Sequence, residues 1–280
     1  MNYIALSPHF PPNYFHFCVH LSNLGVNVLG LADESYDPLR AELREALKEY
    51  YWVPDMHNYD ELLRAAGYFT HRYGKIDRVE SLNEYWLETE ARLRTDFNVP
   101  GFKLADLPAI KRKSEMKKMF QQAGVDSVRG RLIRIPDDAR EFAQAVGFPV
   151  VVKPDIGVGA ARTYKIAGPD ALEEFLSRSV EDYIIEEFVT GEIETFDGLT
   201  DKDGNVVFYT SHKYNSGVME VVLDDSDVYY YSLRDIPPDL EQAGRCIVKA
   251  FGLRERFFHF EFFRKPDHSL VALEVNMRPP

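Results

Sequence analysis

The sequence predicts an α/β domain with a small parallel sheet, followed by an α+β domain. Three observations lead to this prediction. The first hundred residues alternate between short apolar strands and helical patterns, whereas the later residues form runs of strands with few helices. Pro100 and Gly101 break the helical pattern between the two parts. The chain has 280 residues, enough for two domains, and we place these at 1–102 and 103–280.

Strands and helices follow one another regularly in the first domain. Apolar segments typical of strands cover 3–6, 26–33, 51–54 and 76–82. Helical patterns cover 14–25, 38–50, 59–74 and 83–97. This order predicts a parallel sheet flanked by helices. The turn after the first strand lacks GxGxxG, so we do not predict a dinucleotide site there.

The second domain has a different pattern. Helices are expected at 112–125, 136–147, 170–179 and 238–253. The segment 148–166 reads as a buried strand, a loop and another strand. Further strands are expected at 128–135, 182–189, 192–200, 205–214 and 219–225, and the turn PDHS joins a final pair at 256–265 and 270–277.

Composition and charge exclude several classes of protein. No apolar run approaches the roughly 20 residues that a membrane helix needs. The first residues, MNYIALSPHF, lack the basic start and apolar core of a secretory signal, so we expect a cytoplasmic protein. Cys18 and Cys246 are too few for a disulfide framework or a zinc site. The net charge of −12 argues against a protein that binds nucleic acid.

A loop containing glycine follows the apolar strand VVVK. The strand ends with Lys153, and Gly157, Gly159 and Ala160 leave backbone N–H groups accessible in the loop. These groups and a neighbouring lysine together suit a polyphosphate. The loop alone is equally compatible with a flexible hairpin whose lysine extends into solvent. It is not a Walker loop, because no GK[ST] opens a helix here.

The motif IIEEFVTGEIE combines an apolar strand with acidic residues. The strand leads into Glu186, Glu187, Phe188 and Val189. An adenine ring prefers an apolar slot edged by backbone donors and acceptors, and an acid beyond the slot can hold ribose hydroxyls. Glu194 is the candidate for that acid. An edge strand whose acids face solvent explains this motif equally well.

The last two strands carry oxygen ligands at alternating positions. Glu274 and Asn276 share one face of a strand, and Glu261 lies among the phenylalanines of the strand before it. Two carboxylates and an amide suit Mg²⁺, with nucleotide phosphates completing the shell. Arg278 shares the face of Glu274 and could hold an anion. The alternative is a set of structural ion pairs between these acids and neighbouring cations, namely Arg264, Lys265 and Arg278.

The order of these motifs resembles the ATP-grasp superfamily. A lysine on a helix before AGV, a lysine before a glycine loop, EEFVTGEIE, and then EFF followed by LEVNMRP occur in that order. The match spans roughly Lys103 to Pro280, and the closing E-x-N-x-R-P is its most specific part. The sequence is most similar to ligases that join a carboxylate to an amine, with an ATP-binding module like that of carbamoyl-phosphate synthase and biotin carboxylase.

The resemblance assigns a role to each candidate residue. Lys113 and Lys153 would hold the α- and β-phosphates, and Gly157 to Ala161 would close over them. Residues 186–189 would form the adenine hinge and Glu194 the ribose contact. The magnesium (or manganese) ligands would be Glu261, Glu274 and Asn276, while Arg278 and Lys213 would steady the transferred phosphoryl group.

The resemblance also implies an activity. It predicts an ATP-dependent, ADP-forming ligase with a small carboxylate and an amine as substrates, an acyl-phosphate intermediate, and a homodimer as the assembly. The lid lobe would lie at about 124–190, and the second domain would be shortened at its C-terminus, because family members continue past the motif that ends here at Pro280. The alternatives are an ATP-binding module without turnover, and a phosphotransferase or carboxylase with the same fold.

Overall fold

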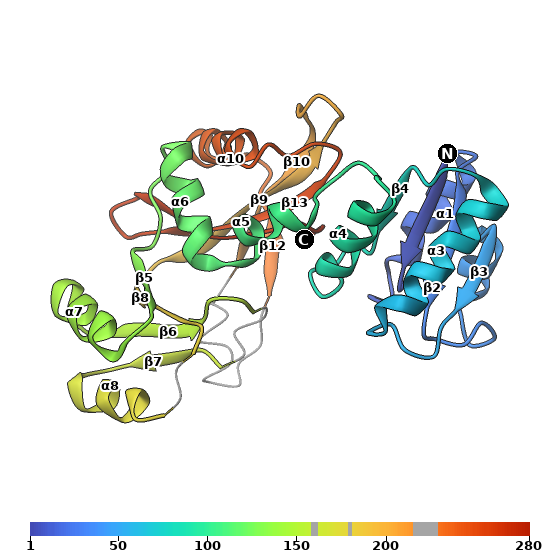
Figure 1. Cartoon of the computed structure of the whole chain (residues 1–280). Coiled ribbons are helices and arrows are strands. Elements are labelled where there is room, and N and C mark those ends of the chain that lie inside the picture. The colour runs from blue at the N-terminus through green and yellow to red at the C-terminus, as the bar shows by residue number, and fades with distance from the viewer. Residues whose placement is uncertain (158–161, 179–180, 215–228) are drawn as a thin grey trace. The chain divides into compact units, whose positions relative to one another are not determined.

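The computed structural model describes residues 1–157, 162–178, 181–214 and 229–280 (Figure 1). The chain divides into two compact units, Met1–Leu107 and Pro108–Pro280. The boundary therefore follows Leu107, five residues beyond the expected position. The predicted strand at 219–225 and the loop residues Gly159 and Ala160 lie outside the described residues.

The first unit is the predicted α/β domain. Its sheet has four parallel strands in the order β3-β2-β1-β4. The strands are β1 (Asn2–Leu6), β2 (Asn27–Ala32), β3 (Glu49–Trp52) and β4 (Arg78–Glu80). The helices are α1 (Phe15–Asn23), α2 (Ala41–Ala46), α3 (Tyr59–Tyr73) and α4 (Leu87–Asp96), and a 3₁₀ turn, η1, covers Leu104–Asp106. The expectation of a small parallel sheet is confirmed.

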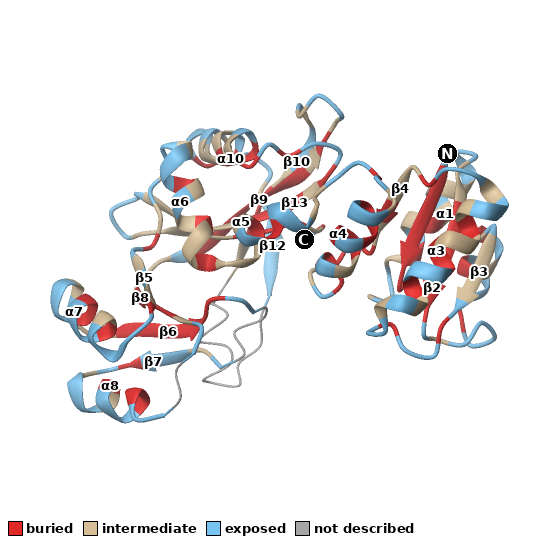
Figure 2. Ribbon diagram, viewed as in Figure 1, coloured by how far each residue is buried: buried red, intermediate tan, exposed pale blue. Residues whose placement is uncertain are grey.

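Helices cover both faces of this sheet. Ile4 and Leu6 of β1 share a core with Phe69 of α3, whereas Tyr3 and Ala5, on the other face of the same strand, pack with α1 and α2. Figure 2 shows β1 buried, in keeping with this packing on both sides. A strand buried on both faces reads as a continuous apolar run, as YIAL does.

The helix expected at 38–50 is shorter than predicted. It ends at Ala46, and Leu47 is already extended. The Lys48 N–H donates to the carbonyl of Val28 at 2.8 Å, and Glu49 begins β3. Pairing with β2 therefore overrides the helical preference of the sequence ALKEY.

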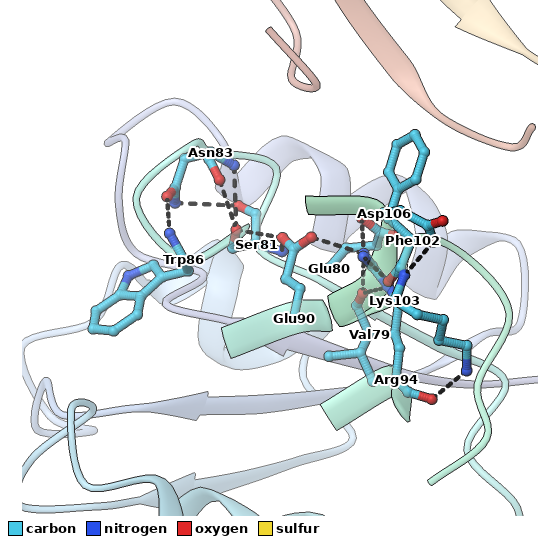
Figure 3. A network of polar contacts seen from close by, with 10 residues as sticks. All are labelled: Val79, Glu80, Ser81, Asn83, Trp86, Glu90, Arg94, Phe102, Lys103 and Asp106. Atoms are coloured by element: carbon cyan, nitrogen blue, oxygen red, sulfur yellow. Dashed lines mark hydrogen bonds and ion pairs between the residues drawn. The ribbon is translucent and has the colours of Figure 1, made fainter. Parts of the chain in front are cut away.

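A buried polar network joins the end of β4 to α4 (Figure 3). Arg94 has no exposed surface, and its Nε donates to the carbonyl of Val79 at 3.0 Å. Its Nη2 lies 2.7 Å from Glu90 Oε2 and 2.8 Å from Glu80 Oε2. Glu90 Oε1 in turn accepts a hydrogen bond from Ser81 Oγ at 2.5 Å. The network fixes the loop that follows β4.

The second unit contains two antiparallel sheets in its described residues. The smaller has the order β5-β8-β6-β7, with β5 (Gly130–Ile133), β6 (Val150–Pro154), β7 (Tyr164–Ile166) and β8 (Tyr183–Glu187). One face is covered by α7 (Pro136–Val146) and α8 (Pro169–Leu176) through an apolar core that includes Val150 and Val152. The residues that alternate with these core residues along β6 and β8 lie on the opposite face of the small sheet.

The larger sheet has the order β12-β11-β9-β13-β14, and β10 also pairs with β9. Its strands are β9 (Glu192–Thr200), β10 (Val206–Thr210), β11 (His212–Tyr214), β12 (Tyr230–Ser232), β13 (Phe257–Arg264) and β14 (Leu270–Asn276). The remaining described helices are α5 (Leu107–Lys111), α6 (Lys113–Ala123) and α10 (Pro238–Ala250). The expected α+β arrangement is confirmed, including the antiparallel hairpin of β13 and β14. None of the helices in the described ranges has the length and hydropathy of a membrane span.

Replacing Gly244 by Ala should lower the free energy of unfolding by about 1–3 kcal/mol. Gly244 lies in α10 against the large sheet, and an added Cβ would meet Phe196 Cδ1 at 2.1 Å. This clash should outweigh the gain in helix propensity, which is about 1 kcal/mol. Urea denaturation followed by circular dichroism measures the change. Gly67→Ala in α3 is the control, because nothing lies within 4 Å of its Cβ position, and it should not destabilise the protein. Equal changes in the free energy of unfolding of Gly244→Ala and Gly67→Ala would contradict the prediction.

Candidate active site

Two lysines that are distant in the sequence meet at one place in the second unit. The carboxylate of Asp155, just after β6, accepts hydrogen bonds from the Ser114 N–H at 2.8 Å and from Ser114 Oγ at 3.0 Å. The Asp155 carbonyl also accepts from the Lys113 N–H at 2.9 Å. These bonds satisfy donors at the start of α6, which a helix cannot satisfy itself. They also fix Lys113 close to the end of the strand that carries Lys153.

Glu186 links the small sheet to α6. It is 2% exposed, with its Oε2 2.7 Å from Lys153 Nζ and its Oε1 2.7 Å from Lys117 Nζ. Burial alone would raise the pKa of Glu186, but the ammonium groups of Lys117 and Lys153 outweigh it and lower the pKa to about 2. The side chain of Glu186 is therefore charged and held between two lysines.

The two lysines differ in their surroundings. Burial lowers the pKa of Lys117, and the nearby positive charge of Lys153 lowers it further. The attraction of Glu186 acts in the opposite direction but is the weaker effect. Burial would also lower the pKa of Lys153, but Glu186, together with Glu274 and Glu261, raises it above its usual value. The charged side chain of Lys153 therefore interacts with carboxylates of the large sheet as well as with Glu186.

The predicted metal ligands lie on one face of β13 and β14. Glu261 is directly opposite Glu274 in the strand register, and Asn276 is opposite His259 on the same face. Asn276 Nδ2 lies 3.4 Å from Glu261 Oε1, and Lys113 Nζ lies 3.1 Å from Glu274 Oε1. The structure therefore brings these three residues together, with Lys113 beside them.

The donor set fits a hard cation. Facing carboxylates repel one another, and a cation between them relieves the repulsion. Two carboxylates and an amide are oxygen donors of the kind that Mg²⁺ takes, with water and phosphate oxygens completing its shell. Within the described ranges, no group of three or more His, Cys, Asp and Glu side chains could hold a metal ion, so the site would depend on Asn276 and on ligands from outside the chain.

A buried cluster beside Glu261 was not predicted from the sequence. Asp197 of β9 contacts two histidine rings, with its Oδ2 2.7 Å from His212 Nδ1 and its Oδ1 2.6 Å from His259 Nδ1. Burial would raise the pKa of Asp197, but hydrogen bonds from these histidines hold it below its usual value. Burial would lower the pKa of His259, but Asp197 and Glu261 raise it to about 9. Burial would likewise raise the pKa of Glu261, whereas His259 holds it low.

The segment predicted to hold adenine has several protein contacts of its own. The Glu187 carboxylate accepts hydrogen bonds from the Arg129 N–H at 2.8 Å and from Arg129 Nε at 2.7 Å. Lys165 Nζ lies 4.0 Å from the centre of the Phe188 ring. Val189 is partly exposed at the end of the segment.

Glu194 does not join the other candidates. By strand alternation it shares a face of β9 with Phe196, which packs against α10. Its Oε2 lies 3.0 Å from Arg264 Nη2, and Arg264 also contacts Asp239 of α10. The face that carries Glu261 is the opposite one.

Gly157 and Arg278 lie near the site, whereas Lys213 is opposite Glu194 in the strand register and therefore lies on the other face of the large sheet. The carbonyl of Gly157 accepts a hydrogen bond from Lys113 Nζ at 2.9 Å, which ties the start of the glycine loop to α6. Lys213 Nζ lies 2.6 Å from Glu192 Oε2. Arg278 donates to the carbonyl of Pro279 at 2.8 Å, and its charge also lowers the pKa of Glu261.

Part of the second unit matches a family of known proteins. Residues 112–217 match the family model "Carbamoyl-phosphate synthase L chain, ATP binding domain". An L-arginine-specific L-amino acid ligase of Bacillus subtilis is 23% identical over 219 residues, which cover 74% of this chain and 52% of that protein. The chain therefore spans about half the length of this relative.

Two solved structures share the fold. The crystal structure of an L-amino acid ligase from Bacillus licheniformis has a TM-score of 0.76 at 19% identity, covering 99% of this chain and 66% of that one. The biotin carboxylase domain dimer of the Hydrogenobacter thermophilus 2-oxoglutarate carboxylase, in complex with MgADP and bicarbonate, has a TM-score of 0.72 at 18% identity, covering 99% and 64%. Both sequence identities are low, so these similarities establish a shared fold and no more.

Proposed function

We propose that this chain is a member of the ATP-grasp superfamily and an ATP-dependent ligase that joins a small carboxylate to an amine. One observation carries the proposal. Lys113 and Lys153 converge with Glu261 and Glu274, so that cations for phosphate and carboxylates for a metal lie at one site. Amino acids are the proposed substrates, because the curated relative with 23% identity is an L-amino acid ligase.

The proposed reaction has two steps. The substrate carboxylate attacks the γ-phosphate of ATP, which gives an acyl phosphate and ADP, and the amine then displaces phosphate to leave an amide. Such a transfer depends on positioning and on neutralising charge. Lys113 and Lys153 would hold phosphate oxygens, and Lys113 would exchange its contact with Glu274 for the nucleotide.

Glu261, Glu274 and Asn276 would hold the metal. Mg²⁺ bound there would supply charge neutralisation for the phosphates. Residues 186–189 would form the adenine hinge, Arg278 would steady the transferred phosphoryl group, and a homodimer is the proposed assembly. The same role for Lys213 would require its side chain to leave Glu192 and the sheet face that carries Glu194. The geometry does not support a ribose contact by Glu194, because Glu194 is paired with Arg264 on the face of β9 opposite to Glu261.

Replacing Glu274 by Gln should slow ATP-dependent ADP release by at least about 100-fold, because one of two metal carboxylates is lost. ADP release is followed for the full chain with pairs of amino acids, and binding of a non-hydrolysable ATP analogue is measured by calorimetry with and without Mg²⁺. Glu173→Gln, an exposed acid in α8, is the control and should leave both properties unchanged.

Each result has a defined meaning. Turnover retained in Glu274→Gln would contradict the metal assignment. Binding of the analogue without turnover for any pair would favour a nucleotide-binding module. ADP release stimulated by bicarbonate without an amine would favour a carboxylase, the activity named for the structurally similar biotin carboxylase domain.

A further inference from the structure

Asp197 is a buried carboxylate that no step of the proposed reaction uses. It has no exposed surface and lies in the middle of β9. Thr195 Oγ donates to its Oδ2 at 2.5 Å, and His212 and His259 contact it through Nδ1. Burying a carboxylate is costly, and this one is compensated by three neighbouring groups. An arrangement of this cost in the centre of a sheet requires an explanation.

The contacts continue from Asp197 to the proposed metal site. His259 Nε2 lies 3.2 Å from Glu261 Oε1, so each nitrogen of the ring faces a different carboxylate. The strand register explains this arrangement, because His259 is directly opposite Asp197 on β9 and opposite Asn276 on β14. Asn276 Nδ2 approaches the same Glu261 Oε1 at 3.4 Å. One oxygen of Glu261 is therefore held by residues of its own strand and of the next.

His212 is a natural comparison within the same cluster. Like His259, it contacts Asp197 through Nδ1, at 2.7 Å. Its ring lies against Tyr230, with the ring centres 5.1 Å apart and the planes perpendicular. The two histidines thus share the carboxylate of Asp197, but it is His259 that is placed two residues from Glu261 and contacts it.

We propose that Asp197 and His259 are positioning residues that orient the carboxylate of Glu261 for the metal. Asp197 fixes the ring of His259, and His259 fixes Glu261 Oε1. Partners of this kind orient metal ligands, and their loss typically reduces metal affinity by 10–100-fold. The inference rests on the proposed function, because it takes Glu261 as a metal ligand.

Two substitutions of His259 separate the contacts of its ring. The amide nitrogen of Asn can replace Nδ1, so His259→Asn keeps the contact with Asp197 and loses the one with Glu261. The amide nitrogen of Gln can replace Nε2, so His259→Gln keeps the contact with Glu261. Mn²⁺ is titrated into the full chain with saturating ADP, and free Mn²⁺ is measured by electron paramagnetic resonance. We expect affinity to fall 10–100-fold in His259→Asn, by about 10-fold in His259→Gln, which loses the contact with Asp197, and by only a few-fold in the control His212→Asn.

The possible outcomes are distinct. Affinity unchanged in His259→Asn, or lowered equally in His212→Asn, would overturn the positioning role while leaving the proposed function in place. Absence of Mn²⁺ binding by the unmodified chain with ADP would overturn both. Thermal unfolding is measured for every variant, and if His259→Asn does not fold, Asp197→Asn is tested instead. That variant should also lose at least about 10-fold in Mn²⁺ affinity, and unchanged affinity would overturn the proposal.

Discussion

Replacing Glu186 by Gln should lower the free energy of unfolding of the second unit by about 3–5 kcal/mol at neutral pH, the cost of breaking a buried ion pair from one side. Glu186 is the carboxylate that both Lys117 and Lys153 contact at 2.7 Å. The substitution keeps the shape of the side chain and removes its charge. Two buried ammonium groups would then face each other without it.

The dependence of the free energy of unfolding on pH should also show the effect of Glu186. The pKa of Glu186 is lowered in the folded state to about 2, from a usual value of 4.5. A carboxylate with a lowered pKa stabilises the fold above its unfolded pKa, and this stabilisation is lost as pH falls towards the folded value. The difference corresponds to about 3 kcal/mol. The gap in stability between the unmodified chain and the variant should therefore be largest above about pH 4.5 and shrink towards pH 2.

Urea denaturation at several pH values measures this change, and the chain contains an internal control. Both of its tryptophans, Trp52 and Trp86, lie in the first unit, so their fluorescence reports that unit while circular dichroism reports the whole chain. The fluorescence transition should be the same with and without the substitution. Glu181→Gln, an exposed acid of the second unit, should leave both transitions unchanged. A loss below about 1 kcal/mol would contradict the prediction, since that is the range of an exposed pair.

Local periodicity was sufficient to predict that Glu261, Glu274 and Asn276 share one face of the final strand pair. Glu274 and Asn276 alternate with buried apolar residues along one strand, and the hairpin turn brings Glu261 opposite Glu274. The strand–loop–strand segment that carries Lys153 was predicted for the same reason, because its signal lies within neighbouring residues. The parallel sheet of the first unit was also predictable, since each strand is followed by its helix.

Contacts between distant elements could not be predicted in this way. Asp197 meets His259 because β9 pairs with β13, and strand order across 62 residues is not encoded in local pattern. Lys117 was not predicted: it lies one helical turn after Lys113, on the same side of α6, but its contact with Glu186 depends on where β8 lies. Alternation places Glu194 on the face of Phe196, and the position of α10, which the local pattern does not reveal, decides that this face is covered.

Replacing Arg94 by Met should destabilise the first unit by about 3–5 kcal/mol, because it leaves buried carboxylates without their cation. The guanidinium contacts Glu90 and Glu80 and donates to the carbonyl of Val79, with no exposed surface (Figure 3). An added Cβ on Gly101 would lie 3.1 Å from Arg94 Cδ, so the chain after α4 also packs closely on this side chain. Loss of the Arg94 guanidinium should therefore destabilise both the loop after β4 and the segment after α4.

Tryptophan fluorescence in urea measures this loss directly, because Trp86 lies in the same loop, where its backbone N–H donates to Asn83 Oδ1 at 3.2 Å. Arg64→Met, an exposed position on α3, is the matched control and should change stability by less than about 0.5 kcal/mol. The double substitution Glu90→Leu and Arg94→Met should recover part of the loss, since it removes both charges of the closest pair. A double variant less stable than Arg94→Met alone would show that Arg94 acts through packing rather than by compensating the charge of Glu90.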